Sequence, residues 1–147
     1  MLLLGGFALS CWSQVTNPSG PTALWKPETT FDQTLPGNVV QRIFDAANAD
    51  DPNMLSGLCD PSFQNDGDTD CICALAPGYS PRTPFPDGKN PLSWDKFKEE
   101  FTKGRLNGIP NVRGNGAEVD IYFGKTGARK ARILLNRKGS NWYLFSL

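Results

Sequence analysis

The sequence contains no histidine among its 147 residues. Histidine is the commonest general base, the usual partner that activates a nucleophilic side chain, and the commonest metal ligand. Its absence excludes most hydrolase arrangements, and no other combination of residues forms a recognisable catalytic site. We therefore predict no catalytic residues, no cofactor and no metal centre, and we expect a protein that is not an enzyme.

The sequence also lacks an excess of charge of either sign. Lysines and arginines number 15, aspartates and glutamates also number 15, and the formal net charge is zero. No overall field attracts nucleic acid or an anionic membrane surface, so we predict no nucleic-acid partner. The length suits one domain with a single core.

A long hydrophobic run is missing as well, and the apolar start is short. Residues 1–10 carry no charge, but about ten residues cannot cross a bilayer of ~30 Å as a helix. We therefore interpret residues 1–11 as a signal peptide. Residues 8–11, Ala-Leu-Ser-Cys, resemble the lipobox of bacterial lipoproteins, which implies that Cys11 is lipidated; ordinary cleavage near Cys11 and an apolar strand are the alternatives.

These observations predict a secreted or periplasmic protein, or one held at the outer cell envelope, that contacts a membrane only through a lipid anchor. Residues 12–36 contain four prolines, Pro18, Pro21, Pro27 and Pro36, and no sustained helix or strand period. Proline at this density favours an extended tether. Trp25 and Phe31 are predicted to dock this tether onto a single domain spanning residues 37–147.

Apolar residues at helical spacing predict three helices in this domain. The first follows Asn38, which is available as an N-cap, and the second begins at Pro52 and ends near Gly57 or Cys59. The third is capped by Ser93 and stops at Gly108 and Pro110. Residues 60–91 are rich in Pro, Gly and Asp and predict an irregular insertion, which alternatively contains a strand at residues 71–75.

After the third helix the hydrophobic period changes to two. Residues 117–123 and 131–135 alternate between apolar and polar side chains, with a turn at residues 124–127, which predicts a hairpin. A second turn at residues 137–140 leads into a final strand over residues 141–147. The sequence therefore predicts an α+β fold in which N-terminal helices pack on an antiparallel meander sheet.

This order of elements, together with the final Gly139-Ser140-Asn141-Trp142-Tyr143-Leu144 hairpin, resembles the nuclear transport factor 2-like superfamily. The resemblance covers residues 36–147 and implies a curved, cone-like sheet wrapped around the first helix. Many secreted or lipoprotein bacterial members have no assigned role, whereas others are isomerases or dehydratases that use an aspartate. A cystatin-like fold is the nearest alternative.

The cysteines predict a structural disulfide. Cys59 paired with Cys71 or Cys73 would close a loop of about a dozen residues and stabilise the fold by ~2–3 kcal/mol. A thiolate metal site is the alternative, although the sequence has no Cys-x2-Cys spacing. Asp66, Asp68 and Asp70 alternate like the start of a calcium loop, but the pattern fails downstream, so we interpret them as turn residues.

Three functions are compatible with these observations. The first is an exported, non-enzymatic binding domain for a small apolar ligand, a glycan or a partner protein. Its predicted ligand-binding residues are Trp94, Phe97, Trp142 and Tyr143, near a basic run on the hairpin. The second is an enzyme that uses a lone aspartate, Asp45 or Asp120. The third is a structural envelope protein that self-associates through sheet edges as a homodimer.

Overall fold

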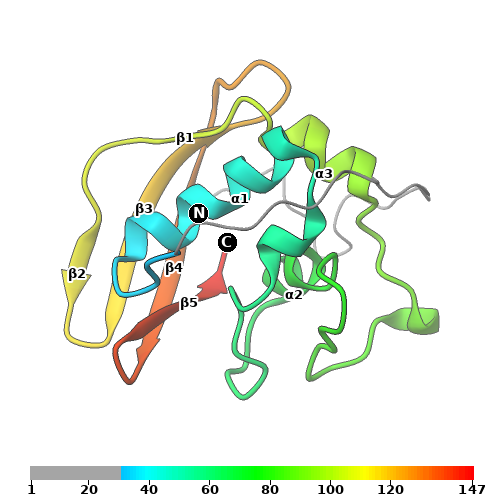
Figure 1. Ribbon diagram of the computed structural model, residues 1–147, viewed down its shortest axis with the longest axis horizontal. Helices are drawn as coiled ribbons and strands as arrows, with labels where there is room; N and C mark the ends of the chain where they lie inside the picture. Colours follow the sequence, from blue (N-terminus) through cyan, green and yellow to red (C-terminus); the bar gives the residue numbers. More distant parts are fainter. Residues whose placement is uncertain (1–30) are drawn as a thin grey trace.

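The computed structural model describes residues 31–147 and shows an α+β fold, with three α-helices and a five-stranded antiparallel sheet (Figure 1). The predicted signal peptide, the lipidation site Cys11 and Trp25 lie outside the described residues. Figure 1 shows α1 crossing one face of the sheet, with α2 and α3 gathered at the end away from β2.

Helix α1 spans Pro36–Ala49 and buries the apolar face that the sequence predicts, including Val40, Ile43 and Phe44. The prediction of Asn38 as its N-cap is wrong, because the helix begins at Pro36 and Leu35 is the N-cap. Proline suits the first helical position because its fixed φ is helical and its missing N–H needs no partner there. Asn38 Nδ2 donates instead to the carbonyl of Asp32 at 3.1 Å.

The second helix begins at Pro52 as predicted but ends before Gly57, and residues 60–91 are more regular than the sequence predicts. A 3-10 helix, η1, spans Pro52–Leu55, and helix α2 spans Gly67–Cys73 where a strand was the alternative. That strand is wrong because Asp66 caps the helix, its carboxylate accepting from the backbone N–H of Thr69 at 2.8 Å. Residues 60–91 therefore contain α2 and a second 3-10 turn, η2, at Pro86–Gly88.

Helix α3 spans Trp94–Phe101 and confirms the predicted cap, because the Ser93 hydroxyl accepts from the N–H of Lys96 at 3.1 Å. It ends earlier than Gly108. The chain turns at Gly104, where a Cβ atom would lie 2.3 Å from the Phe44 ring, so this close approach requires glycine.

The sheet is built around the predicted hairpin of β3, Gly116–Phe123, and β4, Arg129–Lys138. Strand β5, Asn141–Ser146, pairs with β4, with a register shift between Leu134 and Leu135. On the other side of β3 lie two short strands, β1 at Arg105–Leu106 and β2 at Asn111–Arg113. They form one interrupted edge.

The core fills the space between α1, α3 and the inner face of the sheet. Its centre is aromatic: Phe101 stacks near Phe97, Phe123 and Phe44, with ring centroids 5.0, 5.7 and 6.3 Å apart. The inward residues of β3 and β4 complete it, all of them buried: Ala117, Val119, Ile121, Phe123, Ala131, Ile133 and Leu135.

A disulfide joins Cys59 to Cys73, which confirms the predicted structural disulfide and selects Cys73 as the partner. Contacts with the domain begin before residue 37, the predicted boundary. Phe31 packs against the core, as predicted for the end of the tether, and the carbonyl of Gln33 accepts from the N–H of Trp142 at 2.9 Å. Residues 31–36 therefore belong to the domain.

Candidate functional site

The face of the sheet directed away from α1, here called the outer face, carries the polar half of each alternating strand. Glu118, Asp120 and Tyr122 project from β3 on this side, because their neighbours in sequence fill the core. Asp120 is therefore solvent-facing, as predicted, and its carboxylate accepts from Arg132 Nε at 2.8 Å. Arg132 also lies 3.6 Å from the carboxylate of Glu118.

One end of the outer face is hollowed into a pocket of about 230 Å³, here called the outer-face pocket. Four strands contribute to it, and it lies where the register of β4 and β5 shifts between Leu134 and Leu135. Its lining residues are Asn111, Arg113, Gly116, Ala117, Glu118, Leu134, Leu135, Asn136 and Phe145.

The lining combines an apolar floor with a polar rim. Leu134 and Phe145 are half-buried, and the Phe63 ring meets Phe145 edge-on with centroids 6.4 Å apart. Arg113 lies on the rim and is exposed, and no hydrogen bond or ion pair engages its guanidinium within residues 31–147. The pocket can therefore offer donors from Arg113, acceptors from Glu118 and both from its asparagines.

The four predicted ligand-binding residues are not brought together. Trp94, Phe97 and Trp142 are 8%, 0% and 2% exposed and form part of the core. The Trp94 ring stacks on Phe97 at 5.0 Å, and its Nε1 donates to Asp50 at 2.8 Å. Only Tyr143 lies on the outer face, where the Phe63 ring meets it edge-on at 6.1 Å.

The basic run on the hairpin is largely neutralised by neighbours. The side chains of Arg129, Arg132 and Lys138 pair with the carboxylates of Glu100, Asp120 and Asp60 at 3.1, 2.8 and 2.8 Å. Lys130 lies over the Tyr122 ring at 5.7 Å, and Arg137 over the Trp142 ring at 5.2 Å. Such a surface has little charge left for a polyanion.

A second pocket, of about 190 Å³, lies beside the Cys59–Cys73 disulfide. It is lined mainly by backbone and small side chains between η1 and the end of α2, with Tyr79 as its aromatic member. The Tyr79 hydroxyl donates to the carboxylate of Asp70 at 2.8 Å, away from the lining residues. This pocket therefore presents no charged side chain to a ligand.

The three aspartates of the calcium alternative have separate surroundings in α2. Asp66 caps the helix and also accepts from the Ser146 hydroxyl at 2.8 Å and from the N–H of Leu147 at 3.1 Å. Asp68 is 6% exposed, and its Oδ1 has no hydrogen-bond partner. Within residues 31–147 no group of three or more His, Cys, Asp or Glu side chains could hold a metal ion.

Burial sets the pKa values in this cluster. It raises the pKa of Asp68 to about 7, and the nearby charge of Asp66 adds to the effect. Burial also raises the pKa of Asp70, although the hydrogen bond from Tyr79 opposes it. Raised carboxylate pKa values often mark functional sites, but neither aspartate lines either of the two pockets.

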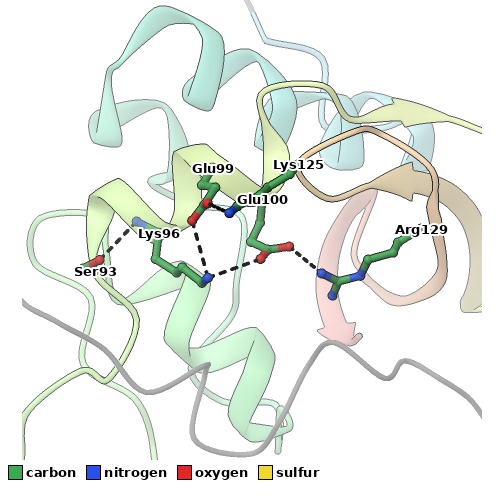
Figure 2. A network of polar contacts seen from close by, with 6 residues as sticks. All are labelled: Ser93, Lys96, Glu99, Glu100, Lys125 and Arg129. Carbon is green, nitrogen blue, oxygen red and sulfur yellow. Dashed lines mark hydrogen bonds and ion pairs between the residues drawn. The ribbon is translucent and has the colours of Figure 1, made fainter.

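A cluster of ion pairs joins α3 to the turn between β3 and β4 (Figure 2). Glu100 is 4% exposed, and its carboxylate lies 3.1 Å from Arg129 Nη1 and 3.8 Å from Lys96 Nζ. Glu99 beside it pairs with Lys125 at 2.8 Å. The Glu100 carbonyl also accepts from the N–H of Gly124 at 2.7 Å, so this cluster fastens the helix to the sheet.

The lone-aspartate alternative placed its base at Asp45 or Asp120. Asp45 lies on the exposed side of α1, where its carboxylate accepts from Gln41 Nε2 at 3.0 Å. Asp120 is paired with Arg132 on the outer face. Neither residue lines one of the two pockets.

Sequence reasoning missed the residues of the outer-face pocket that matter most. Arg113 lies in a strand of three residues, too short to show an alternating pattern. In the final strand Trp142 and Leu144 are buried, whereas Tyr143 and Phe145 alternate with them and are half-buried on the outer face. That alternation was the available signal for Phe145 as an outer-face residue.

The fold is that of a small, disulfide-bonded α+β domain with a pocket on the outer face of its sheet. Comparisons with protein-family models, with curated proteins and with solved structures found no match to this chain. Within residues 31–147, no helix combines the length and the apolar character needed to cross a membrane.

Proposed function

We propose that this protein is an extracytoplasmic, non-enzymatic binding domain whose outer-face pocket holds one residue of a glycan. The Cys59–Cys73 disulfide supports the location, because disulfides persist in oxidising compartments. A lipid on Cys11 and the resemblance to the nuclear transport factor 2-like superfamily remain predictions. The observation that carries the binding function is the composition of the outer-face pocket.

The size of the pocket limits the ligand. Pockets that bury drug-sized molecules measure roughly 300–1,000 Å³, so about 230 Å³ suits one ring-sized unit. A sugar ring has an apolar C–H face and a rim of hydroxyl groups that both donate and accept hydrogen bonds. The half-buried Leu134 and Phe145 suit the ring face, and Arg113, Glu118 and the two asparagines suit the hydroxyl rim.

The chemistry of the pocket supports binding rather than catalysis. Glu118 is the one carboxylate among its lining residues, and it is partly exposed and lies near Arg132. General acid–base catalysis needs a proton donor or acceptor matched to the reaction, and glycoside hydrolysis normally uses two carboxylates. With a single ion-paired carboxylate, the pocket is suited to hold a sugar without cleaving it.

An NMR titration of the amide signals tests this function, with glucose, galactose and N-acetylglucosamine as probes at millimolar concentrations. We expect shifts confined to β2, the start of β3, residues 134–136 of β4 and Phe145 of β5, because these segments line the pocket. Arg113→Ala should weaken binding about tenfold, since it removes a charged hydrogen-bond donor from the rim. Lys130→Ala is the matched control, because Lys130 lies over Tyr122 outside the lining. Absence of shifts with all three sugars, or shifts elsewhere, would contradict the proposal.

A further inference from the structure

The two edges of the sheet differ in how they are protected. The β5 edge is covered: the N–H of Leu144 donates to the carbonyl of Leu58 at 2.8 Å, and the N–H of Trp142 donates to Gln33. At the other edge, β2 pairs with β3 alone among the described residues, and all of Asn111–Arg113 is exposed. An edge strand of this kind can pair with another strand.

Exposed apolar side chains gather at this open edge. In the described part of the chain the large exposed apolar residues are Leu35, Ile109 and Val112, at 52%, 91% and 48%. Val112 lies opposite Ala117, so its side chain is on the α1 side of the sheet. Pro110 lies beside Gly37 at the start of α1, which brings Leu35 and Ile109 to the same end of the molecule.

We propose that β2 pairs antiparallel with β2 of a second copy of this chain, about a two-fold axis that lies between the two Val112 residues. This register places Val112 against the partner's Val112 and Asn111 against the partner's Arg113. No like charges face each other across the contact, and the zero net charge of the chain adds no general repulsion. A strand of three residues is self-complementary here, as an isologous dimer requires.

The pairing also determines where the two outer-face pockets lie. A two-fold axis between antiparallel strands is perpendicular to the sheet, so the outer faces of both copies form one continuous surface. Asn111 and Arg113 project on that face and line the pocket, so the two pockets flank the axis. If the proposed glycan function holds, the dimer would bind two residues of one glycan and gain avidity.

Sedimentation equilibrium of the full chain, from low micromolar to millimolar concentration, tests the pairing. We expect the wild type to dimerise, and Val112→Lys or Val112→Asp each to weaken the dimer at least tenfold, because like charges then meet at the axis. An equimolar mixture of the two variants should recover a dimer, because the lysine of one variant then faces the aspartate of the other at position 112. Ser80→Lys, an exposed position far from β2 in sequence, is the control and should dimerise like the wild type.

Either a wild type that stays monomeric at millimolar concentration or a mixture that stays monomeric would overturn this pairing. Near-ultraviolet circular dichroism confirms that the Val112 variants fold, which is expected because the side chain is half exposed. The two proposals fail separately. A monosaccharide should still shift the pocket signals of monomeric Val112→Lys, because each pocket belongs to one chain. If the wild type dimerises but no sugar shifts the pocket signals, only the proposed glycan function is contradicted.

Discussion

Two buried carboxylates, one on α3 and one on α2, have opposite surroundings. Glu100 on α3 is 4% exposed and has two cations, Arg129 and Lys96, within 4.0 Å. Asp68 on α2 is 6% exposed and has an unpartnered Oδ1, and the charge of the Asp66 carboxylate adds to the rise in its pKa. The first is a satisfied ion pair and the second is a carboxyl group that burial drives towards protonation.

The difference shows how the surroundings of each helix, here called the α3 end and the α2 end of the helical layer, are held. The α3 end is fixed by ion pairs and by the aromatic stack around Phe101. The α2 end is fixed by the Cys59–Cys73 disulfide and by the contacts of Asp66 with the last residues of the chain. Buried polar groups without partners are tolerated at the α2 end, since a covalent bond offsets their cost.

The largest effect is expected from breaking the covalent link at the α2 end. Replacing both Cys59 and Cys73 by alanine should lower the free energy of unfolding by about 3 kcal/mol, because 14 residues separate the cysteines along the chain. Urea unfolding measures the loss. Hydrogen exchange should show α2 losing protection before α3. A loss under about 1 kcal/mol, or equal loss in both helices, would contradict the comparison.

A peptide map under non-reducing conditions identifies which cysteines are linked at the α2 end. It should recover Cys59 linked to Cys73, and it also identifies the partner of Cys71, which is buried and disulfide-bonded as well. A peptide that links Cys71 to Cys11 would exclude a lipid on Cys11, because a cysteine sulfur in a thioether cannot form a disulfide.

A smaller effect is expected at the α3 end. Glu100→Gln should lower the free energy of unfolding by about 2 kcal/mol, because it leaves Arg129 and Lys96 without their buried partner. Glu99→Gln is the matched control. Its carboxylate is 35% exposed, so its loss should cost no more than about 0.5 kcal/mol. Urea unfolding of both variants at one pH makes the measurement, and equal losses would remove the distinction between buried and exposed pairs.

The parts of this fold that the sequence predicts are those with strong periodicity or a clear cap. The alternation over residues 117–123 and the Ser93 cap each record a local physical preference, so they gave the β3–β4 hairpin and α3 directly. The α+β class follows from them. The disulfide could be predicted but the partner of Cys59 could not, because Cys71 and Cys73 are only two positions apart, and helix α2 decides which one reaches Cys59.

The pocket and the open edge were beyond sequence reasoning for a different reason. The aromatic residues that suggest ligand binding, Trp94, Phe97 and Trp142, are used to fill the core. An aromatic side chain serves equally well in a core or a binding site, and only its position in the fold separates the two uses. Arg113 and Asn136 form part of the pocket because separate strands meet there, and no local pattern records that meeting.

The pH dependence of stability depends on Asp68. Because burial raises its pKa in the folded protein to about 7, from an ordinary value of 3.8, the folded state binds the proton more tightly than the unfolded state does. The stability that this proton contributes is fully present below about pH 4 and is lost as the pH rises through about 7. The raised pKa of Asp70 acts in the same direction. The wild type should therefore unfold more easily at about pH 8.5 than at about pH 5.5.

Asp68→Asn removes the charge that high pH creates, so it should stabilise the protein by about 1–2 kcal/mol at high pH and flatten the pH dependence. Asp45→Asn is the control, since Asp45 lies on the exposed side of α1 and should leave the profile unchanged. Urea unfolding across this pH range makes the measurement. Two outcomes would contradict this prediction: a wild type whose stability rises from about pH 5.5 to about pH 8.5, or an Asp68→Asn variant whose stability changes with pH as much as that of the wild type. Either would show that Asp68 is not a buried, unpaired carboxyl group, and the contrast with the ion-paired Glu100 would be lost.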